Sequence, residues 1–290
     1  MPQATVNGLT IEYETTGDRS DPAILLVMGL GAQLIHWPDE FCADLARRGF
    51  FVIRYDNRDV GLSTRTDGPP PDVLAAIQGD TSQATYRLTD MAADGAGVLD
   101  GLGVGAAHAV GVSMGGMIAQ HLAVHHPDRV LSLCSIMSTP TGDMSSDPAA
   151  PEAGVLLLRP PARSREEAIN QSLEGSRIIG SPGFPIDEDE YRVRSGQAYD
   201  RSYHPVGGAR QLCAVVASGD WRPSLAKLEL PTLVIHGAAD PLVRPSWGRA
   251  TAEAIPGAEL LIIEGMGHDL PRGVWDTVVE AIVANTTKAA

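Results

Sequence analysis

The sequence predicts an α/β fold in which helices cover both faces of a mostly parallel central sheet. Short apolar runs rich in β-branched residues alternate with segments of helical periodicity, which is the pattern of such a fold. Glycine and proline supply 31 and 21 of the 290 residues, enough for many turns between strands and helices. The hydrophobic content of 43% and the charged content of 20% are typical of a globular chain rather than a disordered one.

The individual elements follow in order from these patterns. Val6 to Thr15 carries an Asn7-Gly8 pair between apolar stretches, the strongest short hairpin signal, so an antiparallel hairpin should open the sheet. Pro38 suits the first turn of a helix, and Gly49 and Pro127 are suited to end two helices. Further strands are expected at residues 23–28, 51–55, 107–112, 130–137, 232–236 and 259–263, and helices at residues 38–48, 88–102, 114–126 and 273–284.

The stretch from Ser138 to Arg222 breaks this alternation. It is rich in Pro, Arg, Glu and Ser and has weak helical periods but no good strand. A disordered linker and a helical insertion over the sheet are the two interpretations. Apolar anchors within the stretch favour the insertion: Tyr191, Tyr199, Tyr203, Leu212, Val215 and Val216. The predicted organisation is an α/β core of residues 1–137 and 223–290 with a helical cap, or lid, at residues 138–222.

Composition also restricts partners and cofactors. Acidic residues outnumber basic ones by 36 to 22, a formal net charge of −14, which argues against nucleic acid as a partner. Cys42, Cys134 and Cys213 form neither a disulfide framework nor a metal-ligand spacing, and the glycine-rich residues 101–106 precede a strand rather than a helix, so no metal or cofactor is expected. The N-terminus lacks a secretion signal, and the longest apolar stretch, residues 23–32, is too short for a membrane helix. We expect a cytoplasmic protein with no transmembrane segment, and a homodimer stays open.

The strongest functional signal is the pentapeptide from Gly111 to Gly115, which matches the pattern G-x-S-x-G around Ser113. It lies between an expected strand and an expected helix, where a sharp turn would hold the serine in a strained conformation. Glycines are needed on both sides because side chains there would clash with the crossing backbone. Such a turn projects the hydroxyl above the carboxyl edge of the sheet, where open α/β folds bind ligands. Ser113 is therefore the candidate nucleophile.

A serine nucleophile needs a base, and the base needs an orienting acid. His268 is the best-placed base, because it follows the last expected strand in a loop with glycines on both sides of Met266. Asp240 is the best-placed acid, because it comes just after the strand expected at residues 232–236. The chain order Ser113, Asp240, His268, each after a strand, is one of the known orders of a catalytic triad.

The same chemistry needs two backbone N–H groups to hold a developing oxyanion. Met114, which follows the nucleophile at a helix N-terminus, should supply one. The glycine-rich loop after the strand at residues 23–28 should supply the other, with Leu30 as the first choice and Gly29 as the alternative. Four residues are expected to line the substrate pocket: Gly29, Met137, Phe184 and Trp221.

These residues match the α/β-hydrolase superfamily, and the resemblance covers the whole chain. The loop from Asp56 to Ser63 resembles the D-x-R-x-x-G-x-S turn common after that fold's fourth strand. The stretches Val27 to Gly29, Trp37 to Phe41 and Ile53 to Asp56 are similar to those of the aclacinomycin methylesterase group and related actinobacterial carboxylesterases. Met28 stands where a His-Gly pair usually opens the oxyanion loop, a departure that the methylesterase group shares. The resemblance implies a serine esterase with an α-helical cap.

Motifs and resemblance together predict an enzyme that cleaves a small-molecule carboxylic ester through an acyl-enzyme, as a carboxylesterase, methylesterase or lipase-like enzyme. Serine rather than aspartate at residue 113 argues against haloalkane dehalogenases and epoxide hydrolases. A thioesterase, a lactonase, a cofactor-free perhydrolase or haloperoxidase and a carbon–carbon hydrolase can use the same triad and stay open. Outside enzymes, the alternative is a small-molecule receptor on this fold, which would bind a ligand without turnover.

Overall fold

One eight-stranded sheet forms the centre of the computed structural model, which describes residues 2–289. Its strands are β1 (Gln3–Val6), β2 (Leu9–Thr16), β3 (Ala23–Val27), β4 (Phe51–Tyr55), β5 (Ala107–Val112), β6 (Val130–Ile136), β7 (Thr232–Gly237) and β8 (Glu259–Ile263). The spatial order is β1-β2-β4-β3-β5-β6-β7-β8. The strands from β4 onward in this order pair in parallel, and β1 and β2 are antiparallel at one edge. The predicted α/β class with a mostly parallel sheet is confirmed.

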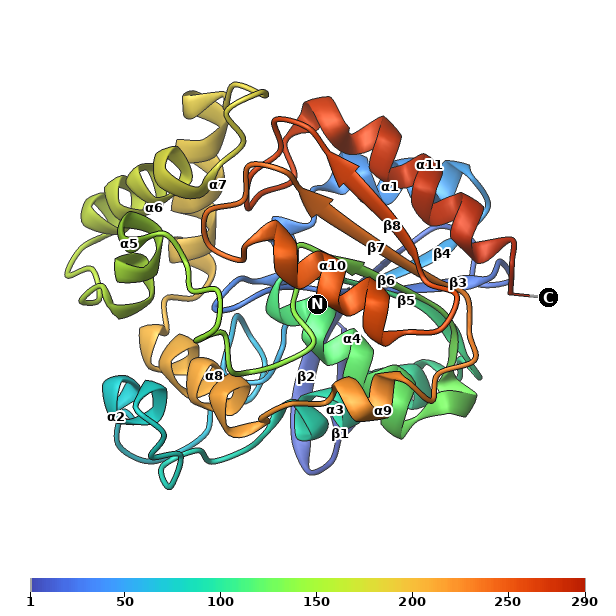
Figure 1. The fold of residues 1–290 in the computed structure, drawn as a ribbon, viewed down its shortest axis with the longest axis horizontal. Helices are drawn as coiled ribbons and strands as arrows, with labels where there is room; N and C mark the ends of the chain where they lie inside the picture. Colours follow the sequence, from blue (N-terminus) through green and yellow to red (C-terminus); the bar gives the residue numbers. More distant parts are fainter. Residues whose placement is uncertain (1, 290) are drawn as a thin grey trace.

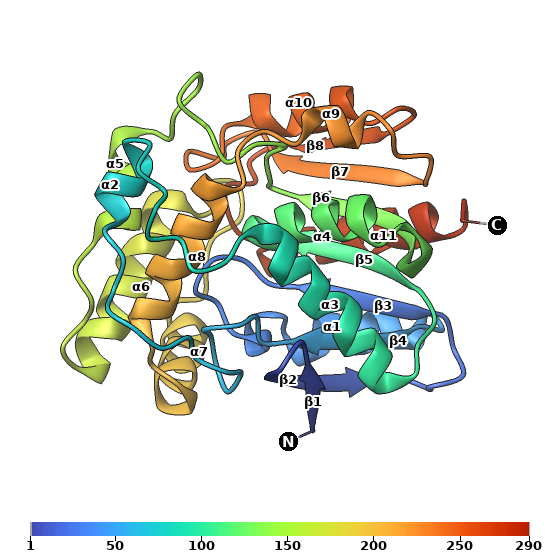
Figure 2. The ribbon, with the colours of Figure 1, turned by 90° about the horizontal axis from the view of Figure 1, so that it is seen from below.

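Helices cover both faces of this sheet (Figure 1, Figure 2). One face carries α3 (Leu88–Leu102), α4 (Met114–His125), α9 (Arg222–Leu225) and α10 (Pro245–Ala254), and the other carries α1 (Asp39–Arg47) and α11 (Trp275–Thr286). Each face has its own apolar cluster, because the outer helices bury one stripe of side chains against the fully buried strands. No helix within residues 2–289 is long and apolar enough to cross a membrane.

The winding of the chain reverses at β3. The next strand, β4, pairs with one side of β3, and β5 pairs with the other side. Ligands of open α/β folds bind at such a point, outside the carboxyl ends of the strands. The loops after β3, β4 and β5 therefore converge where a site is expected.

The predicted elements mostly agree with the structure, with differences of one or two residues at their ends. Asn7 and Gly8 both have positive φ, 50° and 77°, and Val6 pairs with Leu9, so the opening hairpin has the expected two-residue turn. Three helices lacked a sequence prediction: α2 (Val73–Ile77), α9 and α10. The short α2 and α9 bury one residue each and α10 buries three, so none presents a long apolar stripe.

The segment between β6 and β7 is helical, as the favoured interpretation predicts. It contains α5 (Pro151–Gly154), α6 (Arg165–Ile179), α7 (Glu188–Arg201) and α8 (Pro205–Ala217). Its two ends meet, because Thr141 forms an antiparallel bridge with Asp220 and the N–H of Gly142 donates to the carbonyl of Gly219 at 2.6 Å. Figure 2 shows α5 to α8 gathered, with α2, at one end of the sheet. We call residues 138–222 the inserted segment.

One residue predicted to line the pocket, Trp221, lies in the apolar core. Trp221 is 4% exposed and joins the apolar cluster beneath α3 and α4. Its indole packs against the ring of His121, with ring centroids 4.7 Å apart and the planes tilted by 50°, and its Nε1–H donates to Oε1 of Gln120 at 2.7 Å. Gln120 lies seven residues into α4, about 10 Å along the helix from Ser113. The Trp221 ring therefore packs α9 against α4, and its contact with a substrate stays a prediction.

Trp221→Phe should therefore lower stability. The change leaves the buried carbonyl of Gln120 without its donor, which costs about 1–3 kcal/mol. Trp275→Phe is the matched control, since the Trp275 indole, which donates to Leu270, is only partly buried and its loss should cost less. Thermal unfolding of both variants measures the difference. Equal melting temperatures for Trp221→Phe and the unaltered protein would contradict the core assignment.

Candidate active site

Ser113 occupies a strained turn between β5 and α4. Its φ and ψ are 55° and −124°, a conformation that L-residues with a side chain rarely adopt. The turn is held from both sides, because the N–H of Ser113 donates to the carbonyl of Ile136 at 2.8 Å and its carbonyl accepts from Gly116 at 2.9 Å. The hydroxyl is thereby held at the carboxyl edge of the sheet, beside the first turn of α4.

The glycines around Ser113 are needed for space. A Cβ at Gly111 would overlap the backbone of Gly115, and a Cβ at Gly115 would overlap the carbonyl of Val27 at the end of β3. A Cβ at Gly116 would lie 2.7 Å from the Cβ of Ser138. The helix can therefore start directly against β3 and β5 only when these positions lack side chains, as the sequence pattern predicts.

A continuous chain of hydrogen-bond distances connects Ser113 with the two predicted partners. Ser113 Oγ lies 2.9 Å from Nε2 of His268, and Nδ1 of His268 lies 2.7 Å from Oδ2 of Asp240. A proton on Nδ1 satisfies the carboxylate and leaves Nε2 free to accept from the hydroxyl. The structure thus brings together three residues that are far apart in the sequence.

Asp240 is held as a carboxylate. It is 2% exposed, and its Oδ1 accepts from the N–H groups of Leu242 and Val243, both at 2.9 Å. Burial by itself would raise the pKa of Asp240, but the charge of His268 and the hydrogen bonds from His236 and His268 outweigh burial and leave that pKa below its ordinary value. Asp240 is therefore suited to fix the orientation of the imidazole.

The inserted segment holds the loop that carries His268. The N–H of His268 donates to the carbonyl of Ile179 at 2.7 Å, at the end of α6. The N–H of Gly267 donates to Oγ of Ser181 at 2.9 Å, and that hydroxyl also contacts the carboxylate of Asp269. The N–H of Gly183 donates back to the loop, to the carbonyl of Gly265 at 2.9 Å. The position of the His268 imidazole therefore depends on residues of the inserted segment.

The loop after β3, residues 28–34, lies against Ser113. A Cβ at Gly29 would be 3.2 Å from the Cβ of Ser113 and 3.8 Å from its Oγ. Within residues 2–289, the N–H groups of Gly31, Ala32 and Leu34 all have acceptors, whereas no hydrogen bond uses the N–H of Leu30 or Gly29. We call residues 28–34 the oxyanion loop for the role predicted for it. Leu30 stays the first prediction for its donor, and Met114, at the first position of α4, has an N–H without an intrahelical acceptor.

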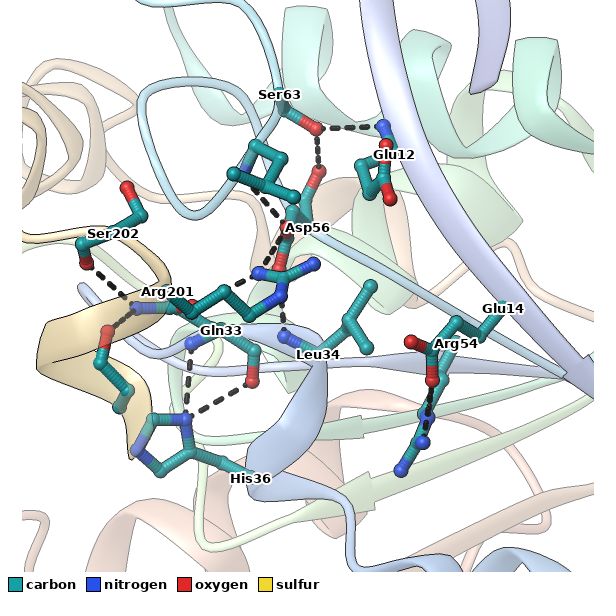
Figure 3. A network of polar contacts seen from close by, with 12 residues as sticks. Glu12, Glu14, Gln33, Leu34, His36, Arg54, Asp56, Ser63, Arg201 and Ser202 are labelled. Carbon is teal, nitrogen blue, oxygen red and sulfur yellow. Dashed lines mark hydrogen bonds and ion pairs between the residues drawn. The ribbon is translucent and has the colours of Figure 1, made fainter. Parts of the chain in front are cut away.

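A buried polar network anchors the far end of this loop (Figure 3). Asp56, which follows β4, is 0% exposed, and its Oδ1 accepts from the N–H of Leu34 at 2.8 Å. Its Oδ2 accepts from Leu62 N–H at 2.9 Å and from Nη1 of Arg201, at the end of α7, at 2.7 Å. Burial raises the pKa of Asp56, against the effects of Leu34, Leu62 and Arg201. Arg201 is therefore the counter-charge that this buried carboxylate needs.

The remaining predicted pocket residues lie near this edge of the sheet. Met137 directly follows β6, is 3% exposed and has a positive φ of 43°. Phe184 packs beside Gly265 and Gly273, on the side of His268. Their contact with a substrate, like that of Gly29, stays a prediction.

Sequence reasoning missed the side chains by which the inserted segment reaches the site. Ser181, Arg201 and Gln211 belong to no recognisable motif. The one available signal was polar residues in apolar surroundings, such as Gln211 before the apolar run of α8. The role of Asp56 was equally hidden, although its turn was recognised.

Fold and site together define the class of protein. The chain belongs to the α/β-hydrolase fold family, whose model matches residues 22–271. The predicted membership of this family is thereby confirmed.

Within this family, the chain is similar to particular esterases and lactonases. The chain is 33% identical to rhodomycin D methylesterase DauP of Streptomyces sp. (strain C5) and to DnrP of Streptomyces peucetius, each alignment covering 98% of this chain and 97% of the relative. The predicted resemblance to the methylesterase group is confirmed. Among solved structures, the enol-lactonase from Burkholderia xenovorans LB400 is similar, with a TM-score of 0.73 and 25% identity over 99% of this chain and 100% of that chain.

Gly115→Ala should destabilise the fold, because its methyl group would overlap the carbonyl of Val27. Overpacking of this kind costs about 1–3 kcal/mol or more. Gly105→Ala is the matched control, because a Cβ there meets nothing within 4 Å. Urea unfolding of both variants measures the two free energies. Equal values for them would mean that the turn at Ser113 does not need a glycine at position 115.

Proposed function

We propose that this protein is a serine hydrolase that cleaves carboxylic esters through an acyl-enzyme. The observation that carries the proposal is the hydrogen-bond chain from Ser113 Oγ through His268 to Asp240, with distances of 2.9 Å and 2.7 Å. A serine, a base and an orienting carboxylate in this arrangement perform acyl transfer on several unrelated folds.

In the acylation step, Nε2 of His268 takes the hydroxyl proton as Ser113 Oγ attacks the ester carbonyl. The bond from Oγ to the carbonyl carbon forms, and the carbonyl π electrons move to the oxygen. Backbone N–H groups of Leu30 and Met114 stabilise that oxyanion. When the tetrahedral intermediate collapses, the ester C–O bond breaks and His268 gives the proton to the leaving alcohol.

In the deacylation step, His268 takes a proton from water, which attacks the acyl-enzyme. The second intermediate releases the carboxylic acid and returns the proton to Ser113 Oγ. Asp240 keeps its negative charge throughout and stabilises the imidazolium that forms twice. The cycle needs no group beyond the residues named here and water.

Residues 138–222 are proposed as the cap over this site and methyl esters as the first substrates to examine. The hydrogen bonds that Ile179 and Ser181 accept from the His268 loop support the cap, since they join the inserted segment to the edge of the sheet that carries Ser113. The names of the two methylesterase relatives support the substrate class. The net charge of −14 mildly disfavours anionic substrates. Cytoplasmic location and a homodimer stay predictions.

Ser113→Ala should lower ester turnover by about four to six orders of magnitude, because the acyl-enzyme can no longer form. The measurement is hydrolysis of p-nitrophenyl esters from acetate to laurate, together with a methyl ester series. Ser132→Ala, which removes a buried hydroxyl bonded to His108, is the matched control and should keep turnover. Turnover that persists in Ser113→Ala would contradict the mechanism. A folded protein inert toward every ester would favour a perhydrolase, a carbon–carbon hydrolase or a receptor instead.

The pH profile of kcat/KM should rise with pH and then level off. His268 must be neutral to accept the Ser113 proton, so acid removes the base and lowers the rate. Asp240 causes no further loss of rate between about pH 5 and 8, because its pKa lies below its ordinary value and the carboxylate stays ionised there. Steady-state kinetics in overlapping buffers measure the profile. A rate that falls as the pH rises would contradict histidine as the general base.

A further inference from the structure

Gln211 of α8 reaches out of the inserted segment to the oxyanion loop. Its side chain is fully buried, at 0% exposed. Oε1 accepts from the N–H of Gly31 at 2.8 Å, and Nε2 donates to the carbonyl of Arg58 at 2.9 Å. One glutamine thus connects α8 with both the loop after β3 and the loop after β4.

The hydrogen bond to Gly31 controls a turn that can adopt two arrangements. Residues 29–32 form a β-turn, in which the N–H of Ala32 donates to the carbonyl of Gly29 at 3.2 Å. Gly31 has a φ of 66° and Leu30 does not have a positive φ, which is the pattern of a type II turn. Glycine at this position also tolerates the type I arrangement, in which the peptide between Leu30 and Gly31 is rotated by about 180°. An acceptor on the N–H of Gly31 selects one of the two.

The two arrangements differ in the direction of the Leu30–Gly31 peptide and leave the Gly29–Leu30 peptide, which carries the N–H of Leu30, in the same direction. Gln211 therefore restrains Leu30 through the peptide that follows it, while the hydrogen bond within the turn sets the direction of the N–H of Leu30. The carbonyl of Gly29 is engaged by Ala32, so the N–H of Leu30, in the same peptide plane, points the opposite way. The N–H of Gly31 is occupied by Gln211. Of the N–H groups of this turn, those of Gly29 and Leu30 are therefore the ones free for a ligand within the described residues.

The other end of the loop is fixed independently, as Figure 3 shows. Asp56 holds the N–H of Leu34, while Gln33 exchanges hydrogen bonds with α7: its Nε2 donates to the carbonyls of Ala198 at 2.6 Å and Ser202 at 2.7 Å. These contacts hold residues 33 and 34 but not the turn at residues 29–32. Asn57 Nδ2 donates to the carbonyl of Met28 at 2.9 Å and so holds the start of the loop. Within residues 2–289, the contact with Gln211 is the side-chain hydrogen bond made by the turn at residues 29–32 itself.

We propose that Gln211 is a positioning residue for the oxyanion hole, acting through Gly31 to hold the N–H of Leu30 in place. The proposal rests on the proposed ester hydrolysis. An oxyanion forms only as the ester carbonyl is attacked, so a misplaced donor weakens the transition state more than the bound substrate. Loss of Gln211 should therefore lower kcat and leave KM nearly unchanged.

The test compares three variants in hydrolysis of p-nitrophenyl acetate. Gln211→Met removes both hydrogen bonds with little change in volume and should lower kcat about 10- to 100-fold, less than the complete loss of a donor. Gln211→Glu keeps an acceptor for the N–H of Gly31 and should recover most of that loss. Gln120→Met is the matched control, since Gln120 is another buried glutamine with two side-chain hydrogen bonds, to Ser135 and Trp221. It should lose stability and keep kcat.

An alkylboronic acid supplies a second readout. Such a compound forms a tetrahedral adduct with the serine and places an oxygen in the oxyanion hole, so Gln211→Met should weaken its inhibition by a factor similar to the loss in kcat. Should Gln211→Met fail to fold, Gln211→Asn takes its place, because its amide is one methylene too short to reach Gly31.

The outcomes separate this proposal from the one on which it rests. A lower kcat with an unchanged KM, weaker boronate inhibition and recovery in Gln211→Glu support the positioning role. An unchanged kcat in Gln211→Met, or an equal loss of kcat in Gln120→Met, overturns the positioning role. Ester hydrolysis still stands in that case, provided that the unaltered protein shows turnover that depends on Ser113. Absence of ester turnover in the unaltered protein overturns both proposals.

Discussion

The close packing of backbone at the end of β5 is the constraint on which the rest of the site depends. Ser113 can hold a positive φ only because α4 begins directly against β3 and β5, and this contact leaves no room for side chains at Gly111 and Gly115. The strain at one residue is therefore balanced by the buried strands around it. Because those strands are parallel, the same edge of the sheet also carries the turns of Asp240 and His268. The geometry of three distant residues thus follows from one sheet.

The inserted segment contributes as much to the site as the sheet does. It holds the His268 loop through Ile179 and Ser181, and it holds the oxyanion loop through Arg201 and Gln211. The two loops flank Ser113 from opposite sides. A movement of this segment relative to the sheet would therefore disturb the base and the oxyanion donors together. The alignment of the proposed catalytic groups therefore depends on where the helices of the inserted segment lie.

Much of this arrangement could be predicted from the sequence, because its causes are local. The glycine spacing around Ser113 and the placing of Asp240 and His268 after strands depend on short-range backbone geometry and on the chain order of parallel strands. The Asn7-Gly8 turn is local in the same way. The positions of these residues could therefore be anticipated before their distances were known.

The missed features depend on packing between distant segments. Trp221 was expected at a pocket as an aromatic residue of the inserted segment, yet its burial is decided by Gln120 and His121 on α4, about a hundred residues earlier. Gln211 and Arg201 gain their roles from Gly31 and Asp56, which lie 180 and 145 residues away in the chain. No periodicity or motif records such pairings, so side-chain contacts of this kind require the structure.

The central claim is that Ser113 is a nucleophile activated by His268, and covalent labelling tests it most directly. The folded protein would be treated with a fluorophosphonate, which reacts with activated serines, and digested for peptide mass spectrometry. The account predicts one adduct, on Ser113, that is lost in His268→Ala although that variant keeps the serine. Labelling of another residue, or labelling of Ser113 that persists at the same rate in His268→Ala, would contradict it.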